Sequence, residues 1–478
     1  MDWSAFLNPI VGNIVNFIYF AIIAGTIVVV ILDNRNPVKT IAWILVLTFL
    51  PFIGLVFYIF FGRNIHRERI LNKKSYKRLT RKPFQESLPQ ASFNGTPEQN
   101  ELINLFQRTN KALLFDGNSI ETYTSGKEET IALVQELYKA RSHIHLEYYI
   151  FEDDAVGRLI RDVLIDKAKE GVKVRLLYDD VGCWHVPKQF YEEMKEAGIE
   201  VRSFLKVRFP QFTSKVNYRN HRKITVIDGK TGFTGGMNIA ERYVKGFEWG
   251  IWRDTQIKIK GKAVYGLQTT FLTDWYMMDQ TLITDNAYFP NMEAAGDIIM
   301  QTVTSDPISP WKEIMQGLTM ALHNAKTYFY IQTPYFLPTE PILFAMQTAA
   351  LAGVDVRLMI PQRADSHLTH FASCSYLNDI MKAGVKVYFY QKGFLHSKLM
   401  VSDDCLATVG STNMDFRSFE HNFEVNTFIY DKGIALRMKD IFLQDQKDSL
   451  PVTGKRWKKR PVKQKVIESI VRLLAPLL

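Results

Sequence analysis

Residues 221–238 read HRKITVIDGKTGFTGGMN and residues 396–413 read HSKLMVSDDCLATVGSTN, so one pattern is written twice in this chain of 478 residues. In both copies a lysine follows the histidine by two residues, an aspartate by seven and an asparagine by seventeen. A histidine and a lysine two residues apart are common on any surface strand. Identical spacing at the further positions is not, and it indicates one functional unit that has been duplicated.

The matched positions predict how each copy is built. Alternate residues of a strand share a face, so each histidine and its lysine point the same way. The aspartate closes the turn before a second strand, and the small residues that follow let the asparagine return towards the pair. The predicted catalytic residues are His221, Lys223, Asp228, His396, Lys398 and Asp403, with the two aspartates holding the turns. Asn238 and Asn413 are expected to bind a substrate phosphate.

The duplication extends on both sides of these motifs. Residues 132–151 parallel residues 313–336, each as an amphipathic helix followed by an aromatic strand. The helix–glycine–strand phrases at Gly171 and Gly353 lie 182 residues apart, which is nearly the offset at the next such phrase. Helices that alternate with short β-branched strands predict an α/β fold, and two copies predict two such domains packed together.

The residue types in the motif suit phosphodiester chemistry. Lysine ammonium groups and asparagine amides donate to phosphate oxygens. One histidine can attack as a nucleophile while the other acts as a general acid, since imidazole titrates near neutral pH. We expect no metal and no cofactor. Asp254 and Glu424 lie 33 and 28 residues after the two histidines, and we expect Asp254 to orient His221 and Glu424 to orient His396. Ordinary surface carboxylates remain the alternative.

The N-terminus is apolar. Residues 3–32 contain no charged side chain, and residues 40–62 contain none either. Each stretch is long enough for a helix that crosses a bilayer, so we predict two transmembrane helices. A signal peptide does not fit, because no Lys or Arg precedes the apolar run and no cleavage pattern follows it. Pro51 leaves open a kinked or partly inserted second segment.

Basic residues gather beside the apolar segments. The chain has 59 Lys and Arg against 49 Asp and Glu, a net charge of +10, and nine of the basic residues lie in residues 63–82 with a single acid. Positive charge beside a membrane helix stays on the cytoplasmic side, so the rest of the chain is expected there, in contact with anionic lipid. Three scattered cysteines fit a reduced compartment.

Two further segments are predicted to contact lipid. The basic C-terminal tail surrounds Trp457 and ends in an apolar strip, which favours an interfacial anchor over a merely solvated tail. The first copy also carries eleven extra residues within residues 205–220, and Arg208, Phe209 and Phe212 there suggest a lip on the membrane surface. An ordinary solvated loop is the alternative for that insertion.

The doubled motif resembles the phospholipase D superfamily, whose two motifs build one shared active site. With the N-terminal helices and the ending RLLAPLL, the chain is similar to the bacterial cardiolipin synthases of that superfamily. The resemblance implies two pseudo-symmetric α/β/α domains with mixed sheets. It also implies an enzyme of the plasma membrane that joins two phosphatidylglycerols through a phosphatidyl-histidine intermediate, with His221 as the nucleophile and His396 as acid and then base.

The predicted division of the chain follows from these features. It comprises a membrane anchor at 1–62, a basic segment and linker at 63–119, two domains at 120–290 and 291–450, and the basic amphipathic tail at 451–478. Three alternatives compete with the expected activity: a nuclease of the same superfamily, a phospholipase D that hydrolyses lipids, and a lipid-binding scaffold without activity. The membrane segments argue against nucleic acid as the partner. The oligomeric state leaves no trace in the sequence.

Overall fold

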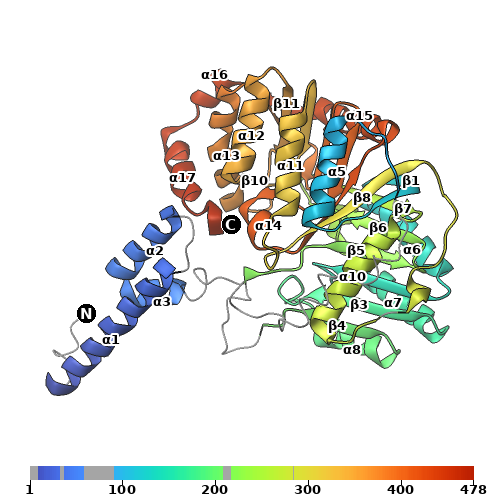
Figure 1. The fold of residues 1–478 in the computed structure, drawn as a ribbon, viewed down its shortest axis with the longest axis horizontal. Coiled ribbons are helices and arrows are strands. Elements are labelled where there is room, and N and C mark those ends of the chain that lie inside the picture. Colours follow the sequence, from blue (N-terminus) through green and yellow to red (C-terminus); the bar gives the residue numbers. More distant parts are fainter. Residues whose placement is uncertain (1–8, 33–36, 59–90, 208–216, 284, 478) are drawn as a thin grey trace. The chain divides into compact units, whose positions relative to one another are not determined.

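The computed structural model describes residues 9–32, 37–58, 91–207, 217–283 and 285–477 (Figure 1). The chain separates into two units. The first comprises residues 1–72 and 207–218, and the second comprises residues 73–206 and 219–478. The predicted basic cluster at 63–82 and the predicted lipid contacts Arg208, Phe209 and Phe212 lie outside the described residues.

In the first unit an apolar helix forms as expected. Helix α1 (Pro9–Leu32) contains an 18-residue window with a mean hydropathy of 2.6 and is long enough to cross a membrane. The second apolar segment is shorter and broken. Helix α2 (Pro37–Phe49) ends before Leu50, whose backbone is not helical, and Pro51 starts helix α3 (Pro51–Phe57). Proline fits the first turn of a helix but not its interior, which accounts for the interruption.

The second unit is built on one continuous mixed sheet of sixteen strands. Its first half contains β1 (Leu114–Ser125), β2 (His143–Tyr148), β3 (Lys173–Asp179), β4 (Glu200–Phe204), β5 (Lys223–Ile227), β6 (Thr231–Gly235) and β7 (Ile251–Lys260). Its second half contains β8 (Ile298–Ser305), β9 (Tyr328–Gln332), β11 (Asp355–Pro361), β12 (Lys386–Tyr390), β13 (Gly393–Leu395), β14 (Leu399–Ser402), β15 (Leu406–Gly410), β17 (Glu424–Ile429) and β18 (Ser449–Val452). A separate pair joins β10 (Phe336–Leu337) to β16 (Met414–Asp415).

The strand order displays the duplication. The first half runs β1-β7-β6-β5-β2-β3-β4 and the second runs β8-β17-β15-β14-β9-β11-β12, the same arrangement twice. The two copies meet where β1 pairs antiparallel with β8. The prediction of two pseudo-symmetric α/β domains is thus confirmed. Their fusion into a single sheet was not foreseen, because nothing in a local pattern says that two edge strands pair.

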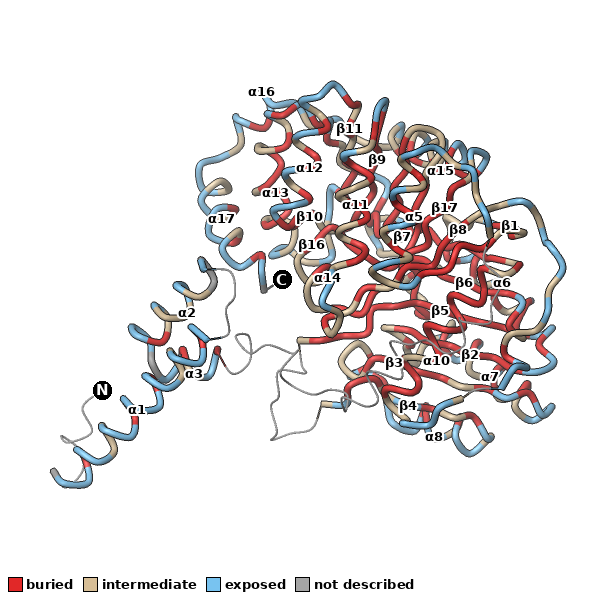
Figure 2. Tube along the Cα trace, in the orientation of Figure 1, coloured by how far each residue is buried: buried red, intermediate tan, exposed pale blue. Residues whose placement is uncertain are grey.

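Helices cover both faces of this sheet (Figure 1). On the first half lie α6 (Gly126–Lys139), α7 (Ala155–Lys169), α8 (Lys188–Glu196) and α10 (Val264–Asp279). On the second half lie α11 (Glu313–Asn324), α12 (Glu340–Leu351), α13 (His367–Lys382) and α15 (Lys432–Lys447). Helices α10 and α15 share one apolar core with strands of both halves. Figure 2 shows the strands as the most continuously buried part of the chain.

The predicted linker differs from the structure in its second part. Residues 97–109 form helix α5 (Pro97–Thr109), which begins at a capping box between Thr96 and Gln99. Phe106 is fully buried in the core of the second half, and β1 begins at Leu114 in the middle of the sheet. The amphipathic stretch of residues 101–107 is therefore a core helix, since its apolar face finds a partner in α11.

The C-terminal tail folds onto the second half. Helix α16 (Gly454–Lys458) and helix α17 (Val462–Arg472) pack against α13, and Arg472 pairs with Asp379. The prediction that Trp457 contacts the membrane is wrong. The residue is 8% exposed, its ring packs on Phe389, and Arg460 lies over that ring at 4.5 Å. The tryptophan serves the core because the helix is docked on the protein there.

Candidate active site

Each predicted catalytic histidine lies just before a strand of its own half and is held by the backbone of the other half. The amide of His221 donates to the carbonyl of Phe423 at 2.9 Å, and the amide of His396 donates to the carbonyl of Arg253 at 2.7 Å. Strand β13, which leads into His396, also pairs in parallel with β7 of the first half. Each half of the sheet therefore holds the histidine of the other half in place, an exchange of contacts between the two copies.

This exchange reverses the predicted pairing of carboxylates. Glu424 follows Phe423, and both of its oxygens accept from Nδ1 of His221 at 3.0 and 3.1 Å. Asp254 follows Arg253, and its Oδ2 lies 2.6 Å from Nδ1 of His396. Both carboxylates do contact a histidine, but the assignment of Asp254 to His221 and of Glu424 to His396 is wrong. The bonds join residues 203 and 142 positions apart, beyond what spacing within one copy can indicate.

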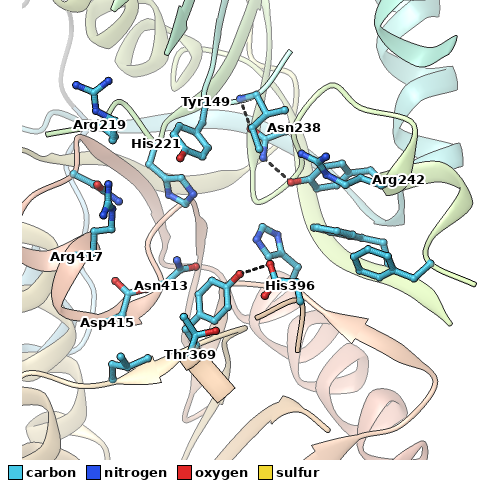
Figure 3. A pocket seen from close by; sticks show the side chains of 18 residues that line it. Tyr149, Arg219, His221, Asn238, Arg242, Thr369, His396, Asn413, Asp415 and Arg417 are labelled. Carbon is cyan, nitrogen blue, oxygen red and sulfur yellow. Dashed lines mark hydrogen bonds between the residues drawn. The ribbon is translucent and has the colours of Figure 1, made fainter. Parts of the chain in front are cut away.

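The carboxylates set the orientation of both rings. A hydrogen bond from Nδ1 to a carboxylate places the proton on Nδ1 and leaves Nε2 available. Figure 3 shows His221 and His396 facing the same space. Both residues line one cavity of about 500 Å³.

Each of the two lysines lies beside its own histidine and is fully buried. Lys223 Nζ donates to the carbonyl of His221 at 2.5 Å and lies over the ring of Tyr149. Lys398 Nζ donates to the carbonyl of His396 and is 2.9 Å from Nδ1 of that ring. The strand geometry thus brings each lysine to the side of its own histidine, as the spacing of two residues predicts.

Asp228 and Asp403 hold turns and do not line the cavity. Oxygens of Asp228 accept from the amides of residues 141–143, and those of Asp403 accept from residues 326–328. Both have left-handed backbones, with φ of 53° and 51°. A five-residue strand separates Asp228 from its histidine, a length of roughly 17 Å at the usual rise per residue. The predicted role of the two aspartates in the turns is confirmed. Direct contact of either carboxylate with a substrate in the cavity is wrong as a prediction, because neither lines the cavity.

The two asparagines line the cavity in different states. Asn238 accepts from the amide of Ile150 at 3.0 Å and donates to the Tyr243 hydroxyl at 2.5 Å, as dashed lines show in Figure 3. Oδ1 of Asn413 is buried and accepts no hydrogen bond from a described residue. The second asparagine therefore keeps the greater capacity to bind a ligand.

The walls beside the two histidines differ. Rings of Trp252, Phe394 and Tyr243 lie 5.1, 5.6 and 6.1 Å from the ring of His396. The ring of Tyr149 packs edge-on against His221 at 5.1 Å. Burial raises the pKa of that tyrosine, and the positive charges of Arg417 and Arg219 act in the opposite direction. Most of the aromatic rings thus lie beside His396, where Arg242 also lies over Trp252 at 5.8 Å, whereas Arg219 and Arg417 lie on the side of His221 (Figure 3).

Burial controls the charge of the histidines and lysines. It lowers the pKa of His221 to about 4, although the Glu424 carboxylate acts in the opposite direction. It lowers the pKa of His396 to about 3, helped by the nearby Lys398 ammonium. Burial also lowers the pKa of Lys398 to about 8 and that of Lys223 well below its usual value. At neutral pH both rings are therefore neutral, and Lys398 stays mostly charged.

The carboxylates remain ionised. Burial acts to raise the pKa of Asp254 and Glu424, but the adjacent lysine and histidine of each outweigh it and hold both pKa values below the usual range. Each buried cluster thus pairs its negative charge with a neighbouring cation, as buried charges require.

The small residue at position 236 or 411, fifteen residues after each histidine, has a packing role that the sequence pattern did not predict. A Cβ on Gly236 would lie 2.0 Å from Oδ1 of Asp254, so only glycine leaves room for that carboxylate. Ser411, at the equivalent position, donates from its hydroxyl to Glu424.

The sequence pattern also did not predict Tyr149, Trp252 and Arg417 as residues of the cavity, because they lie outside the repeated phrase. Among the described residues, no group of three or more His, Cys, Asp or Glu is arranged to hold a metal ion.

Two carboxylate-paired histidines on one cavity, each with a buried lysine beside it and both built by a duplicated mixed sheet, define an enzyme with phospholipase D-like domains. The family model described as "Cardiolipin synthase, PLD-like domain" matches residues 133–275 and 318–446, and the model "Phospholipase_D-nuclease N-terminal" matches residues 21–63. The chain belongs to the cardiolipin synthase family.

Curated relatives match along nearly the whole chain. The major cardiolipin synthase ClsA of Bacillus subtilis (strain 168) is 39% identical over 463 residues, covering 95% of this chain and 96% of that protein. A cardiolipin synthase of Geobacillus thermodenitrificans is 42% identical over 458 residues, covering 94% and 91%. A crystal structure of phosphatidylserine synthase from Haemophilus influenzae Rd KW20 has a TM-score of 0.60 at 15% identity, covering 79% and 98%, and supports the fold alone.

Proposed function

We propose that this chain is a phosphatidyltransferase that joins two phosphatidylglycerol molecules into cardiolipin and releases glycerol, through a phosphatidyl-histidine intermediate. The observation that carries the proposal is the pair of carboxylate-oriented histidines facing one cavity. A covalent intermediate divides one difficult displacement into two easier ones, and it requires a nucleophile and an acid on the same phosphorus. Membership of the cardiolipin synthase family supports the substrate.

In the first step Nε2 of His221 attacks the phosphorus of one phosphatidylglycerol. The bond from phosphorus to the glycerol oxygen breaks, and His396 gives its Nε2 proton to that oxygen. Lys223 and Lys398 stabilise charge on the phosphate oxygens. In the second step His396 takes a proton from the hydroxyl of another phosphatidylglycerol, whose oxygen forms the new bond to phosphorus as the bond to His221 breaks.

The low pKa of His396 fits a role that begins when substrate binds. Burial keeps the ring neutral at neutral pH. An anionic phosphodiester in the cavity favours the protonated ring, because an opposite charge nearby raises the pKa of a histidine. The acid would therefore be charged only when there is a phosphate to act on.

The activity is tested with phosphatidylglycerol as the sole lipid. The purified protein should form cardiolipin and free glycerol in equal amounts. Phosphatidic acid as the main product would indicate the hydrolytic alternative. His221→Ala should lower turnover by at least about a thousandfold, and lipid labelled in its phosphate should mark His221 when the reaction is quenched. A label on His396 would reverse the two histidine roles.

We propose that the enzyme is a multi-pass protein of the bacterial plasma membrane, with its catalytic unit in the cytoplasm and anionic lipids as its partners. The apolar helix α1 supports membrane association. Along α17 and the residue that follows it, exposed apolar side chains follow helical spacing, at Val462, Val466, Ile470 and Leu473. This segment is rich in lysine. Such a row suits the boundary between headgroups and acyl chains. Protease added outside intact cells should leave the catalytic unit uncut, and cleavage there would contradict this orientation.

A further inference from the structure

The proposed reaction requires two phosphates in one cavity. The donor lipid carries the phosphate that reacts. The acceptor phosphatidylglycerol carries a second phosphate, one glycerol away from its attacking hydroxyl, which passes unchanged into cardiolipin. Both are anionic, so the cavity needs positive charge for each. In the proposed mechanism Lys223 and Lys398, which are buried beside the histidines, serve the reacting phosphate.

Three arginines line the cavity, and they differ in what they already contact. Arg219 Nη1 lies 3.4 Å from the buried Asp179, and Arg242 Nη1 lies 3.5 Å from Glu152. The guanidinium of Arg417 makes no hydrogen bond or ion pair with any residue in the described ranges. Its five donors are therefore open to a ligand, and a guanidinium suits the paired oxygens of a phosphate.

The position of Arg417 is fixed by the fold. It lies in the short helix α14 (Phe416–Glu420), which Asp415 caps by accepting from the Ser418 amide. The carbonyl of Arg417 accepts from the amides of residues 421 and 422. Figure 3 shows Arg417 in the same wall as Asn413 and Asp415, on the side of His221.

This wall also contains unused polar atoms. Oδ1 of Asn413 and Oδ1 of Asn422 are buried without a hydrogen bond from the described residues, and both asparagines line the cavity. Two carboxylates line it as well, but each already accepts a hydrogen bond: Asp415 from the amide of Ser418, and Asp365 from the Tyr335 hydroxyl at 2.7 Å. The wall can thus hold a glycerol hydroxyl next to a phosphate.

We propose that Arg417 binds the phosphate of the acceptor phosphatidylglycerol and so selects a lipid as the acceptor. This inference rests on the proposed function. No bond to Arg417 forms or breaks; it is a specificity residue that places the acceptor hydroxyl near the phosphatidyl-enzyme. Water and free glycerol carry no phosphate and gain nothing from this contact.

Two reactions of the same enzyme separate this role from a general one. Cardiolipin synthesis needs the acceptor phosphate. Exchange of labelled glycerol into phosphatidylglycerol uses the same donor and intermediate, but its acceptor is free glycerol. In the full-length protein with phosphatidylglycerol micelles, Arg417→Gln should lower the ratio of synthesis to exchange by roughly 10- to 100-fold, the scale of a lost charge-assisted contact. Arg417→Lys should restore part of that ratio.

Arg242→Gln is the matched control, since it removes another arginine of the same cavity that already has a carboxylate partner. It should leave the ratio within about twofold of the wild type, which supports the assignment to Arg417. Equal loss of synthesis and exchange in Arg417→Gln, or an unchanged ratio, would overturn the inference. Neither result affects the proposed function, which fails only if the wild-type protein forms no cardiolipin or no labelled histidine.

Discussion

The two histidine sites share one design but have different surroundings. At both, the histidine amide bonds to the opposite half, a carboxylate from that half accepts from Nδ1, and a buried lysine lies alongside. His221 has a glutamate that uses both oxygens and a hydroxyl from Ser411 that supports it. His396 has an aspartate packed on Gly236 and is ringed by aromatic side chains. Duplication supplied two equivalent histidine sites, and their different neighbours fit the proposed division into a nucleophile and an acid.

Among the changes that compare the two sites, the largest effect should come from removing the carboxylates one at a time. We expect Asp254→Asn and Glu424→Gln each to lower cardiolipin synthesis by about a hundredfold or more, because each ring loses its oriented tautomer. A phosphatidyl ester of p-nitrophenol distinguishes the sites, since its leaving group needs no protonation. With crossed pairing and His221 as nucleophile, Asp254→Asn keeps the initial burst of p-nitrophenol and Glu424→Gln loses it.

The opposite pattern, with the burst lost in Asp254→Asn alone, would show either within-copy pairing or His396 as the nucleophile. Phosphate labelling of the histidines separates those two explanations, because it identifies the nucleophile independently of the carboxylates.

The small-residue step offers a second test of how the halves differ. Gly236→Ala should lower activity by at least about tenfold, because the new Cβ would collide with Oδ1 of Asp254 and displace the partner of His396. Ser411→Ala removes one hydrogen bond to Glu424 and should lower activity only a few-fold. Steady-state rates of the two purified variants are compared, with thermal unfolding as a check on folding. Equal losses would mean that the two carboxylates are held alike.

The lysines predict a pH dependence. Burial lowers the pKa of Lys398 to about 8, so its ammonium is present below that pH and is lost as pH rises through it. Phosphate binding needs the charge, and kcat/KM should therefore fall towards a tenfold decrease per pH unit above about pH 8. A profile of initial rates from pH 6 to pH 10 at low lipid concentration checks this. A flat profile to pH 10 would show that Lys398 keeps its proton in the free enzyme.

The smallest effect on catalysis is expected at the turns. Asp228→Ala and Asp403→Ala each remove the acceptor of three backbone amides and should lower the free energy of unfolding by about 1–3 kcal/mol. The protein that remains folded should keep nearly the wild-type kcat, because neither carboxylate reaches the cavity. Asparagine at either position keeps an acceptor and tolerates the left-handed backbone, so Asp228→Asn should recover part of the stability. A collapse of kcat at unchanged stability would return the aspartates to the catalytic set.

The sequence alone determined the features that depend on short spacing. A histidine and a lysine two residues apart must share a strand face, and a 23-residue apolar helix shows in composition. The repeat at Gly171 and Gly353 announced two matching halves, and both glycines do end a helix with positive φ. These patterns need only neighbouring residues to be read.

Only the tertiary structure decided which distant residues meet. In that structure β1 pairs with β8 in one sheet, and Trp457 is buried. Glu424 is hydrogen-bonded to His221, and Asp254 is hydrogen-bonded to His396. Such contacts join segments that lie far apart along the chain, and their energy depends on how two packed surfaces fit. No periodicity within either segment carries that information. The repeated motif therefore predicts the reacting groups but not the partners that orient them.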